Sequence, residues 1–152
     1  MGAGVISPLL EWGRDCPESR WQRGRQGTGY MKLDLSVGDV PPFVGTWVER
    51  CLAMLVGDPL GHDAWLLRYP AGTHIPAHRD ENELGDHHRI NVLLEGPGAL
   101  RIDGVPVELR PGDAIVFRPD QVEHSVDAVE CERWVFSVGA VCAGQERPPA
   151  ED

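Results

Sequence analysis

Seven short apolar runs between residues 64 and 141 decide the fold: AWLLRY (64–69), RINVLL (89–94), ALRI (99–102), VPVEL (105–109), AIVF (114–117), HSVDAV (124–129) and RWVFSVGAV (133–141). Turn signals separate nearly all of these runs, including GPG at 96–98, Asp103-Gly104 and Pro111-Gly112-Asp113. Short strands at this spacing are typical of an antiparallel barrel or sandwich. The sequence therefore predicts a mainly β chain.

The part of the chain before these runs predicts a small support for the β region. The run YMKLDLS (30–36) alternates apolar and polar residues, as a half-buried strand does, and FVGTWVERCLAML (43–55) has apolar residues at helical spacing. Residues 1–27 have neither period, so we expect an irregular lead-in and only one N-terminal helix. The polar tail 144–152 contains two prolines and is expected to be disordered.

Length and charge exclude several classes of protein. A chain of 152 residues fits one domain, which we place at 1–143, with support over 1–60 and the chemically active core over 61–143. The formal net charge of −10 makes nucleic acid and anionic membranes poor partners. Four cysteines without a CxxC pair predict free thiols, and no apolar run reaches the roughly 18 residues of a membrane span. We expect a cytoplasmic monomer or homodimer.

Three residues form a potential metal site. His78 and Asp80 follow the extended run THIPAH, and residues two apart in a strand point to the same face. His124 begins another expected strand 44 residues after Asp80, a separation that antiparallel strands of a barrel can close. Two histidines and one carboxylate are the facial triad that holds Fe(II) and leaves coordination positions open. His78, Asp80 and His124 are therefore the expected metal ligands and catalytic residues.

A resemblance to a known family covers about residues 68–139. The matching stretches are RYPAGTHIPAHRD (68–80), HHRINVLL (87–94), PGDAIVFRPDQVEHSV (111–126) and ERWVFSVG (132–139). They resemble the Fe(II)- and 2-oxoglutarate-dependent oxygenases, whose core is a double-stranded β-helix, or jelly roll. The resemblance implies that the HxD…H residues bind iron and that the chain uses 2-oxoglutarate and O2 to hydroxylate an unactivated C–H bond, releasing succinate and CO2.

The same resemblance assigns the cosubstrate site. It implies that Arg133, nine residues after His124, binds the distal carboxylate of 2-oxoglutarate, and that Tyr69, nine residues before His78, offers its phenol there. An arginine suits this role because its planar guanidinium meets a carboxylate with two hydrogen bonds.

The other polar and aromatic residues near these motifs are assigned from their strand positions. Arg89 and Asn91 lie two apart on one face of the RINVLL strand and are also expected to contact cosubstrate or substrate. We assign His87 to solvent and Trp65, together with Trp134 and Phe136, to the core. The acidic segment 79–86 suggests a site entrance that disfavours polyanions and tolerates neutral or cationic groups.

Other members of the barrel fold remain as alternatives. Gly72 with His78, and Pro119 with His124, also resemble the two motifs of the cupins, so a cupin-type metalloenzyme or metal-binding barrel without 2-oxoglutarate stays open. Cupins usually present HxH followed by a glutamate, whereas this chain has HxD. AlkB-type nucleic-acid demethylases have an asparagine where this chain has Leu67, which argues against them. The expected substrate is a small molecule or a protein side chain.

Overall fold

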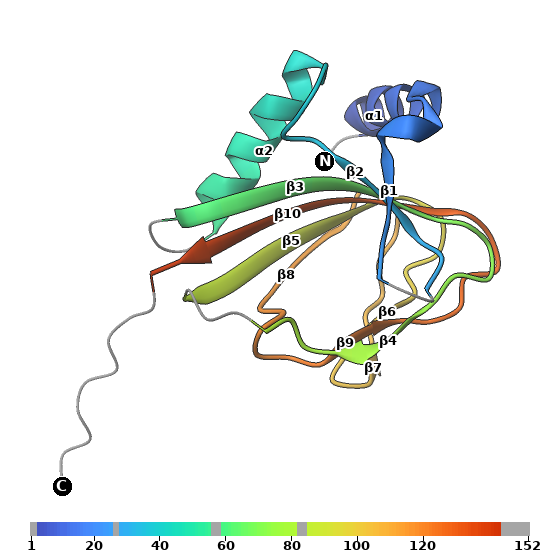
Figure 1. Cartoon of the computed structure of the whole chain (residues 1–152). Coiled ribbons are helices and arrows are strands. Elements are labelled where there is room, and N and C mark those ends of the chain that lie inside the picture. Colours follow the sequence, from blue (N-terminus) through green and yellow to red (C-terminus); the bar gives the residue numbers. More distant parts are fainter. Residues whose placement is uncertain (1–2, 26–27, 56–58, 82–84, 144–152) are drawn as a thin grey trace, which may run out of the picture.

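The computed structural model describes residues 3–25, 28–55, 59–81 and 85–143, and these form two antiparallel sheets and two helices (Figure 1). The elements in chain order are α1 (Ala3–Asp15), the short 3-10 helix η1 (Glu18–Arg20), β1 (Trp21–Arg23), β2 (Met31–Asp34), α2 (Pro42–Met54), β3 (Pro59–Tyr69), β4 (Ile75–His78), β5 (Asp86–Glu95), β6 (Leu100–Ile102), β7 (Val105–Pro106), β8 (Ala114–Phe117), β9 (His124–Val126) and β10 (Arg133–Cys142).

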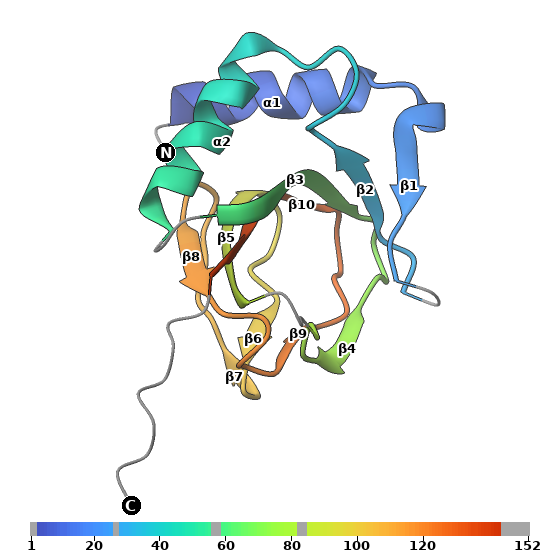
Figure 2. The ribbon, with the colours of Figure 1, turned by 60° about the vertical axis from the view of Figure 1, so that its left-hand side comes forward.

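The two sheets face each other and enclose the site. The larger sheet has the order β1-β2-β3-β10-β5-β8 and the smaller has β4-β9-β6-β7. Figure 2 shows the smaller sheet opposite the larger one, with both helices on the larger sheet's outer side. The predicted mainly β jelly-roll core is confirmed.

Strand alternation gives the larger sheet two different faces, one packed against the helices and one facing the smaller sheet. Even-numbered residues of β3, β5 and β10 pack with the helices in one core: Ala64, Leu66, Ile90, Val92, Leu94, Trp134, Phe136, Val138 and Ala140. Odd-numbered residues of the same strands face the smaller sheet: Asp63, Trp65, Leu67, Tyr69, Arg89, Asn91, Arg133 and Ser137. Successive residues of a strand point to opposite faces, so each strand contributes to both stability and the site.

Helix α2 confirms the helix predicted over 43–55. Pro42 occupies its first turn, where a missing backbone N–H costs little, and the chain becomes extended at Leu55. Its buried residues follow helical spacing: Val44, Trp47, Val48 and Cys51.

The expectation of an irregular segment over 1–27, and thus of a single helix, is wrong because α1 spans Ala3–Asp15. Ile6, Leu9 and Leu10 are buried at the spacing of one helical face. Gly13 completes that face, because a Cβ there would lie 2.5 Å from Leu66 and 3.1 Å from Trp134. The glycine is therefore a site of close helix–sheet approach and not a helix break.

The remaining predictions about the chain have mixed outcomes. All four cysteines are free thiols, as expected. Within the described ranges, neither helix is long and apolar enough to cross a membrane. The predicted disordered tail at 144–152 lies outside the described residues.

Candidate metal centre and its cavity

A cavity of about 480 Å³ lies between the two sheets. Its walls come from β3, β5 and β10 on one side and from β4, β6 and β9 on the other, with β2 along one flank. All seven site residues predicted from the sequence line it: Tyr69, His78, Asp80, Arg89, Asn91, His124 and Arg133. The structure therefore brings the whole predicted set into one space.

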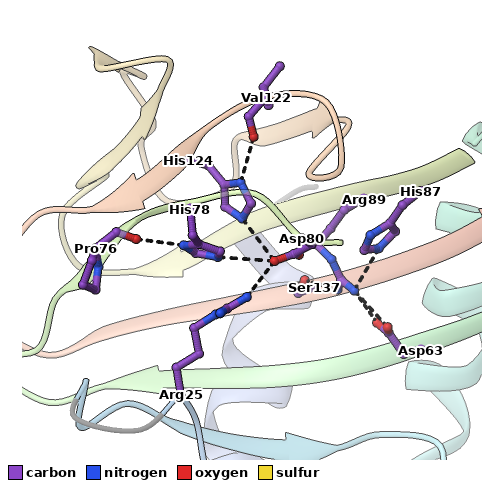
Figure 3. A network of polar contacts seen from close by, with 10 residues as sticks. All are labelled: Arg25, Asp63, Pro76, His78, Asp80, His87, Arg89, Val122, His124 and Ser137. Atoms are coloured by element: carbon purple, nitrogen blue, oxygen red, sulfur yellow. Dashed lines mark hydrogen bonds and ion pairs between the residues drawn. The ribbon is translucent and has the colours of Figure 1, made fainter. Parts of the chain in front are cut away.

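The three expected metal ligands converge because β4 and β9 are paired. His78 and His124 are direct partners in the antiparallel ladder, so these two residues lie side by side although they are far apart in the sequence. Asp80 follows β4, and its backbone N–H donates to the carbonyl of Pro119 at 2.8 Å, which holds the carboxylate beside the imidazoles. One ligand atom from each of the three residues lies within 4.8 Å of the others. Figure 3 shows the three side chains pointing toward one another.

Both imidazoles are oriented for metal binding by backbone carbonyls. His78 Nδ1 lies 2.8 Å from the Pro76 oxygen and His124 Nδ1 lies 3.2 Å from the Val122 oxygen. A carbonyl can only accept, so each Nδ1 carries a proton, and each Nε2 is turned toward the centre, where a neutral imidazole presents its lone pair to a metal. Both Nε2 atoms point to one oxygen of Asp80, at 3.3 Å from His78 and 3.9 Å from His124.

Burial favours the neutral, metal-binding form of His124, whereas a neighbouring cation is paired with Asp80. Burial lowers the pKa of His124, although the Val122 carbonyl partly opposes the shift, and the nearby His78 lowers it further. The neutral imidazole is the form that binds metal. Arg25 donates to Asp80 Oδ1 at 2.8 Å, so a cation already occupies the carboxylate. A metal ion would compete with this ion pair for the same oxygen.

Arg133 lies at the buried end of the cavity without an acidic partner. It is 2% exposed, its Nε donates to the Pro97 carbonyl at 3.0 Å, and its guanidinium carbon lies 4.7 Å from the centre of the Tyr69 ring. Tyr69 in turn stacks on Tyr30 with ring centres 5.3 Å apart. Among the described residues, no carboxylate lies within ion-pair distance of Arg133. Burial lowers the pKa of Arg133, and Tyr69 offsets part of that shift.

Arg89 and Asn91 belong to a chain of hydrogen bonds on the inner face of the larger sheet. Arg89 donates to both oxygens of Asp63, at 2.8 and 2.9 Å, and to Ser137 Oγ at 2.8 Å. Ser137 then donates its one hydrogen to Asn91 Oδ1 at 2.6 Å. Because the guanidinium can only donate, Ser137 must accept from Arg89 and donate to Asn91. The two N–H groups of the Asn91 amide nitrogen take no part in these hydrogen bonds, and Asn91 lines the cavity.

The structure corrects two assignments and adds residues that the sequence analysis missed. Trp65 lines the cavity and is not part of the core, and His87 is half-buried in the same wall and does not face solvent. Both occupy odd-numbered strand positions, shared with Tyr69 and Arg89, and this alternation could have revealed them. Trp134 and Phe136 are buried core residues, as expected.

Lys32 and Arg25 are further cavity residues that were not predicted. Lys32 lies on β2, on the same side as Tyr30, and strand alternation could have indicated its direction. Arg25 follows β1 and contacts Asp80, 55 residues away along the chain, and no local sequence signal marks that contact.

Comparison with known proteins agrees with this architecture. Residues 65–136, just under half of the chain, match the family described as Cupin domain. No curated protein matches the sequence. The fold and the three-residue group thus define a cupin-like jelly roll with the geometry of a metal site.

Three solved structures illustrate the range of proteins with this fold. A prolyl-4-hydroxylase from Pseudomonas putida superimposes with a TM-score of 0.75 at 17% identity, covering 95% of this chain and 89% of that one. A prolyl hydroxylase from Trichoplax adhaerens, in complex with a hypoxia inducible factor peptide, gives 0.66 at 15% identity, covering 90% and 74%. KdgF from Halomonas sp. gives 0.52 at 18% identity, covering 80% and 84%. At these identities the likeness establishes the fold alone.

Proposed function

We propose that this chain is an Fe(II)- and 2-oxoglutarate-dependent dioxygenase that hydroxylates an unactivated C–H bond of a small molecule or a protein side chain. One observation carries the proposal. The three potential metal ligands share a cavity with a buried arginine that has no acidic partner among the described residues.

The donor set fits iron. His78 and His124 offer two neutral imidazole nitrogens and Asp80 offers one carboxylate oxygen, which is the composition of the facial triad of non-haem Fe(II) oxygenases. The adjoining cavity leaves space for exogenous ligands on the open side of the three residues. When bound, Fe(II), 2-oxoglutarate and O2 supply the oxidising chemistry and yield succinate and CO2 as co-products.

The buried arginine fits the cosubstrate. A buried guanidinium without a counter-ion is costly, and a ligand carboxylate supplies the missing charge. Nε of Arg133 is already used by Pro97, so its Nη groups are the ones available to a carboxylate. In the proposed role Tyr69 contributes its hydroxyl beside them, and Asn91, which lines the cavity, offers its N–H groups.

Apolar side chains complete the proposed role of the cavity. Ile75, Leu100 and Val126 of the smaller sheet line it alongside the charged groups. Arg133 itself is 2% exposed, and this burial strengthens its interaction with a carboxylate.

A cupin-type metalloenzyme that does not use 2-oxoglutarate is the second candidate. The cupin match over residues 65–136 favours it. It uses the same His78, Asp80 and His124 and gives Arg133 no cosubstrate to bind, so the two candidates differ in one measurable property.

Anaerobic titration separates the candidates. Fe(II) and 2-oxoglutarate are added to metal-free protein, and the visible charge-transfer band of the chelate is followed. We expect the band in the native chain. Asp80→Ala should lose metal binding and therefore the band, and Arg133→Gln should need at least about tenfold more 2-oxoglutarate to form it. Arg50→Gln removes one positive charge from an exposed position on α2 and is the matched control.

The outcome is decisive only in folded protein. Circular dichroism checks each variant, and Arg133→Lys provides a second replacement that keeps the buried charge. A well-folded native chain that binds Fe(II) but forms no band with 2-oxoglutarate would refute the dioxygenase proposal and support the second candidate.

A further inference from the structure

The only lysine in the sequence, Lys32, lies in the cavity wall. It sits on β2 opposite Leu67 of β3, and its Nζ lies 4.4 Å from the centre of the Trp65 ring. A cation above an indole face is attracted to it, so the aromatic ring holds the ammonium group at the wall. Neither the metal site nor the proposed cosubstrate site uses this residue.

The charged side chains of the cavity wall are four cations (Arg25, Lys32, Arg89 and Arg133) and three carboxylates (Asp63, Asp80 and Glu81), and the structure pairs two of the cations. Arg25 is paired with Asp80 and Arg89 with Asp63. Lys32 and Arg133 also line the cavity, and for both of them no carboxylate of the described ranges lies within 4 Å. A chain with a net charge of −10 thus has a cavity lining whose four cations and three carboxylates give a formal charge of +1, with Lys32 and Arg133 as its unpaired cations among the described residues. Such charge attracts an anionic ligand and favours its entry.

Lys32 and Arg133 lie at different aromatic rings. Lys32 Nζ is 4.4 Å from the centre of the Trp65 ring and Arg133 Cζ is 4.7 Å from the centre of the Tyr69 ring, and these two rings belong to residues four positions apart on β3. Arg133 pairs with Tyr69 and Lys32 pairs with Leu67, so the two residues contact opposite edges of β3 and are offset by two positions along it. Two strand spacings alone separate their backbones by about 9–10 Å. If Arg133 receives the distal carboxylate of 2-oxoglutarate, Lys32 remains for a second anionic group.

We propose that Lys32 binds a carboxylate of the substrate, and that the substrate is a small carboxylic acid such as an amino acid. This inference rests on the proposed dioxygenase function and names its substrate class. One free ammonium group balances one carboxylate, and as a compact point charge with three donors it binds a carboxylate without requiring a fixed planar geometry. A phosphate would bring a second negative charge toward Asp63, Asp80 and Glu81, which also line the cavity.

The single lysine makes a direct test possible. Protein grown with ¹³C-labelled lysine gives one side-chain signal set, which belongs to Lys32. With Zn(II) in place of iron and with 2-oxoglutarate present, this signal is followed while the twenty amino acids and simple monocarboxylates of two to six carbons are added. Each acid is compared with its own carboxamide, and inorganic phosphate is added separately.

We expect at least one acid to shift the Lys32 signal to saturation while its carboxamide does not. By calorimetry, the affinity for that acid falls about tenfold in Lys32→Gln, is largely restored in Lys32→Arg and is unchanged in the exposed control Arg50→Gln. A protein in which no acid is distinguished from its carboxamide, or in which phosphate binds more tightly than every carboxylate, overturns the proposal. So does 2-oxoglutarate alone saturating the signal and blocking the other acids.

The test also separates this inference from the proposed function. Formation of the Fe(II)–2-oxoglutarate band without recognition of any acid at Lys32 refutes the substrate class and leaves the dioxygenase proposal standing. Adding the acids to protein without metal and 2-oxoglutarate tests whether Lys32 binds them independently of the proposed cosubstrate. Recognition of acids at Lys32 in a protein that forms no band supports the carboxylate site and refutes the dioxygenase proposal.

Discussion

Replacement of Gly139 by alanine tests whether Arg89 and its hydrogen-bond chain occupy the position described above. Gly139 of β10 is the ladder partner of Arg89 on β5. A Cβ at Gly139 would lie 2.4 Å from Arg89 Nη2 and 2.7 Å from its Cζ, well inside van der Waals contact. The guanidinium must therefore retreat by about 1 Å, and it loses its present bonds to Asp63 and Ser137.

The magnitude follows from the bonds that are lost. Hydrogen bonds involving a charged group contribute about 1.5–3 kcal/mol each, but the Asp63 side chain is 42% exposed, so water replaces much of that interaction. We expect a gross loss of about 2–3 kcal/mol, reduced by the roughly 0.5–1 kcal/mol that alanine gains over glycine within a strand. The net loss of about 1–2 kcal/mol corresponds to a melting temperature lower by about 2–8 °C.

A double-mutant cycle with Arg89→Met measures the effect. Urea unfolding of the native chain, both single variants and the double variant gives the coupling free energy between positions 89 and 139. Once Arg89 is removed, Gly139→Ala is expected to be neutral or slightly stabilising, so the coupling reaches about 2 kcal/mol. Equal destabilisation by Gly139→Ala in both backgrounds would refute this placement of the guanidinium. Gly61→Ala, whose Cβ would meet no atom within 4 Å, is the control.

Three further predictions concern regions outside the metal centre. Gly45 is exposed on α2 and its Cβ would meet open space, so Gly45→Ala should raise the free energy of unfolding by about 0.5–1 kcal/mol, and a loss in urea unfolding would contradict the description of α2. Burial raises the pKa of Asp120, but the hydrogen bonds from Arg118 and from the His87 backbone N–H, together with the positive charge of Arg118, outweigh it, so the net pKa lies below its ordinary value. The resulting stabilisation is present above about pH 4 and is lost as the pH falls through the lowered pKa. Asp120→Asn should therefore lower the free energy of unfolding at pH 7 but change it little near pH 2. A loss of the same size at both pH values would argue against the ion pair. Exposed Cys131 should react with a thiol reagent in the native state while Cys51, whose pKa is raised by burial, should react only on unfolding; mass spectrometry of the labelled sites decides.

The metal centre was predictable because its signal is local on each strand. His78 and Asp80 are two residues apart, and the turn signals around them predict the antiparallel strands that bring in His124. The register that places His78 opposite His124 was not predictable, since pairing is decided by the packing of the whole barrel.

Helix α1 shows why some elements were missed. Its apolar residues Ile6, Leu9 and Leu10 have the right spacing, but Pro8 inside the helix and Gly13 at its packing face are both read as helix-breaking residues. The reason for Gly13 is visible only once Leu66 and Trp134 are seen beneath it. The contact of Arg25 with Asp80 likewise depends on a loop position that no sequence period indicates.

The alternating faces of β10 have a consequence for insertions and deletions. Removal of one residue from this strand would transpose its two sets of side chains, moving Trp134 and Phe136 toward the cavity and Arg133 and Ser137 toward the helices. A shift of one residue along β10 would thus bury the charge of Arg133 in the apolar core and place aromatic rings in the cavity. Substitutions, in contrast, can change one face while the other is retained. The chain can therefore acquire a new specificity by point replacements at odd-numbered positions, whereas the length of β10 is constrained from both sides.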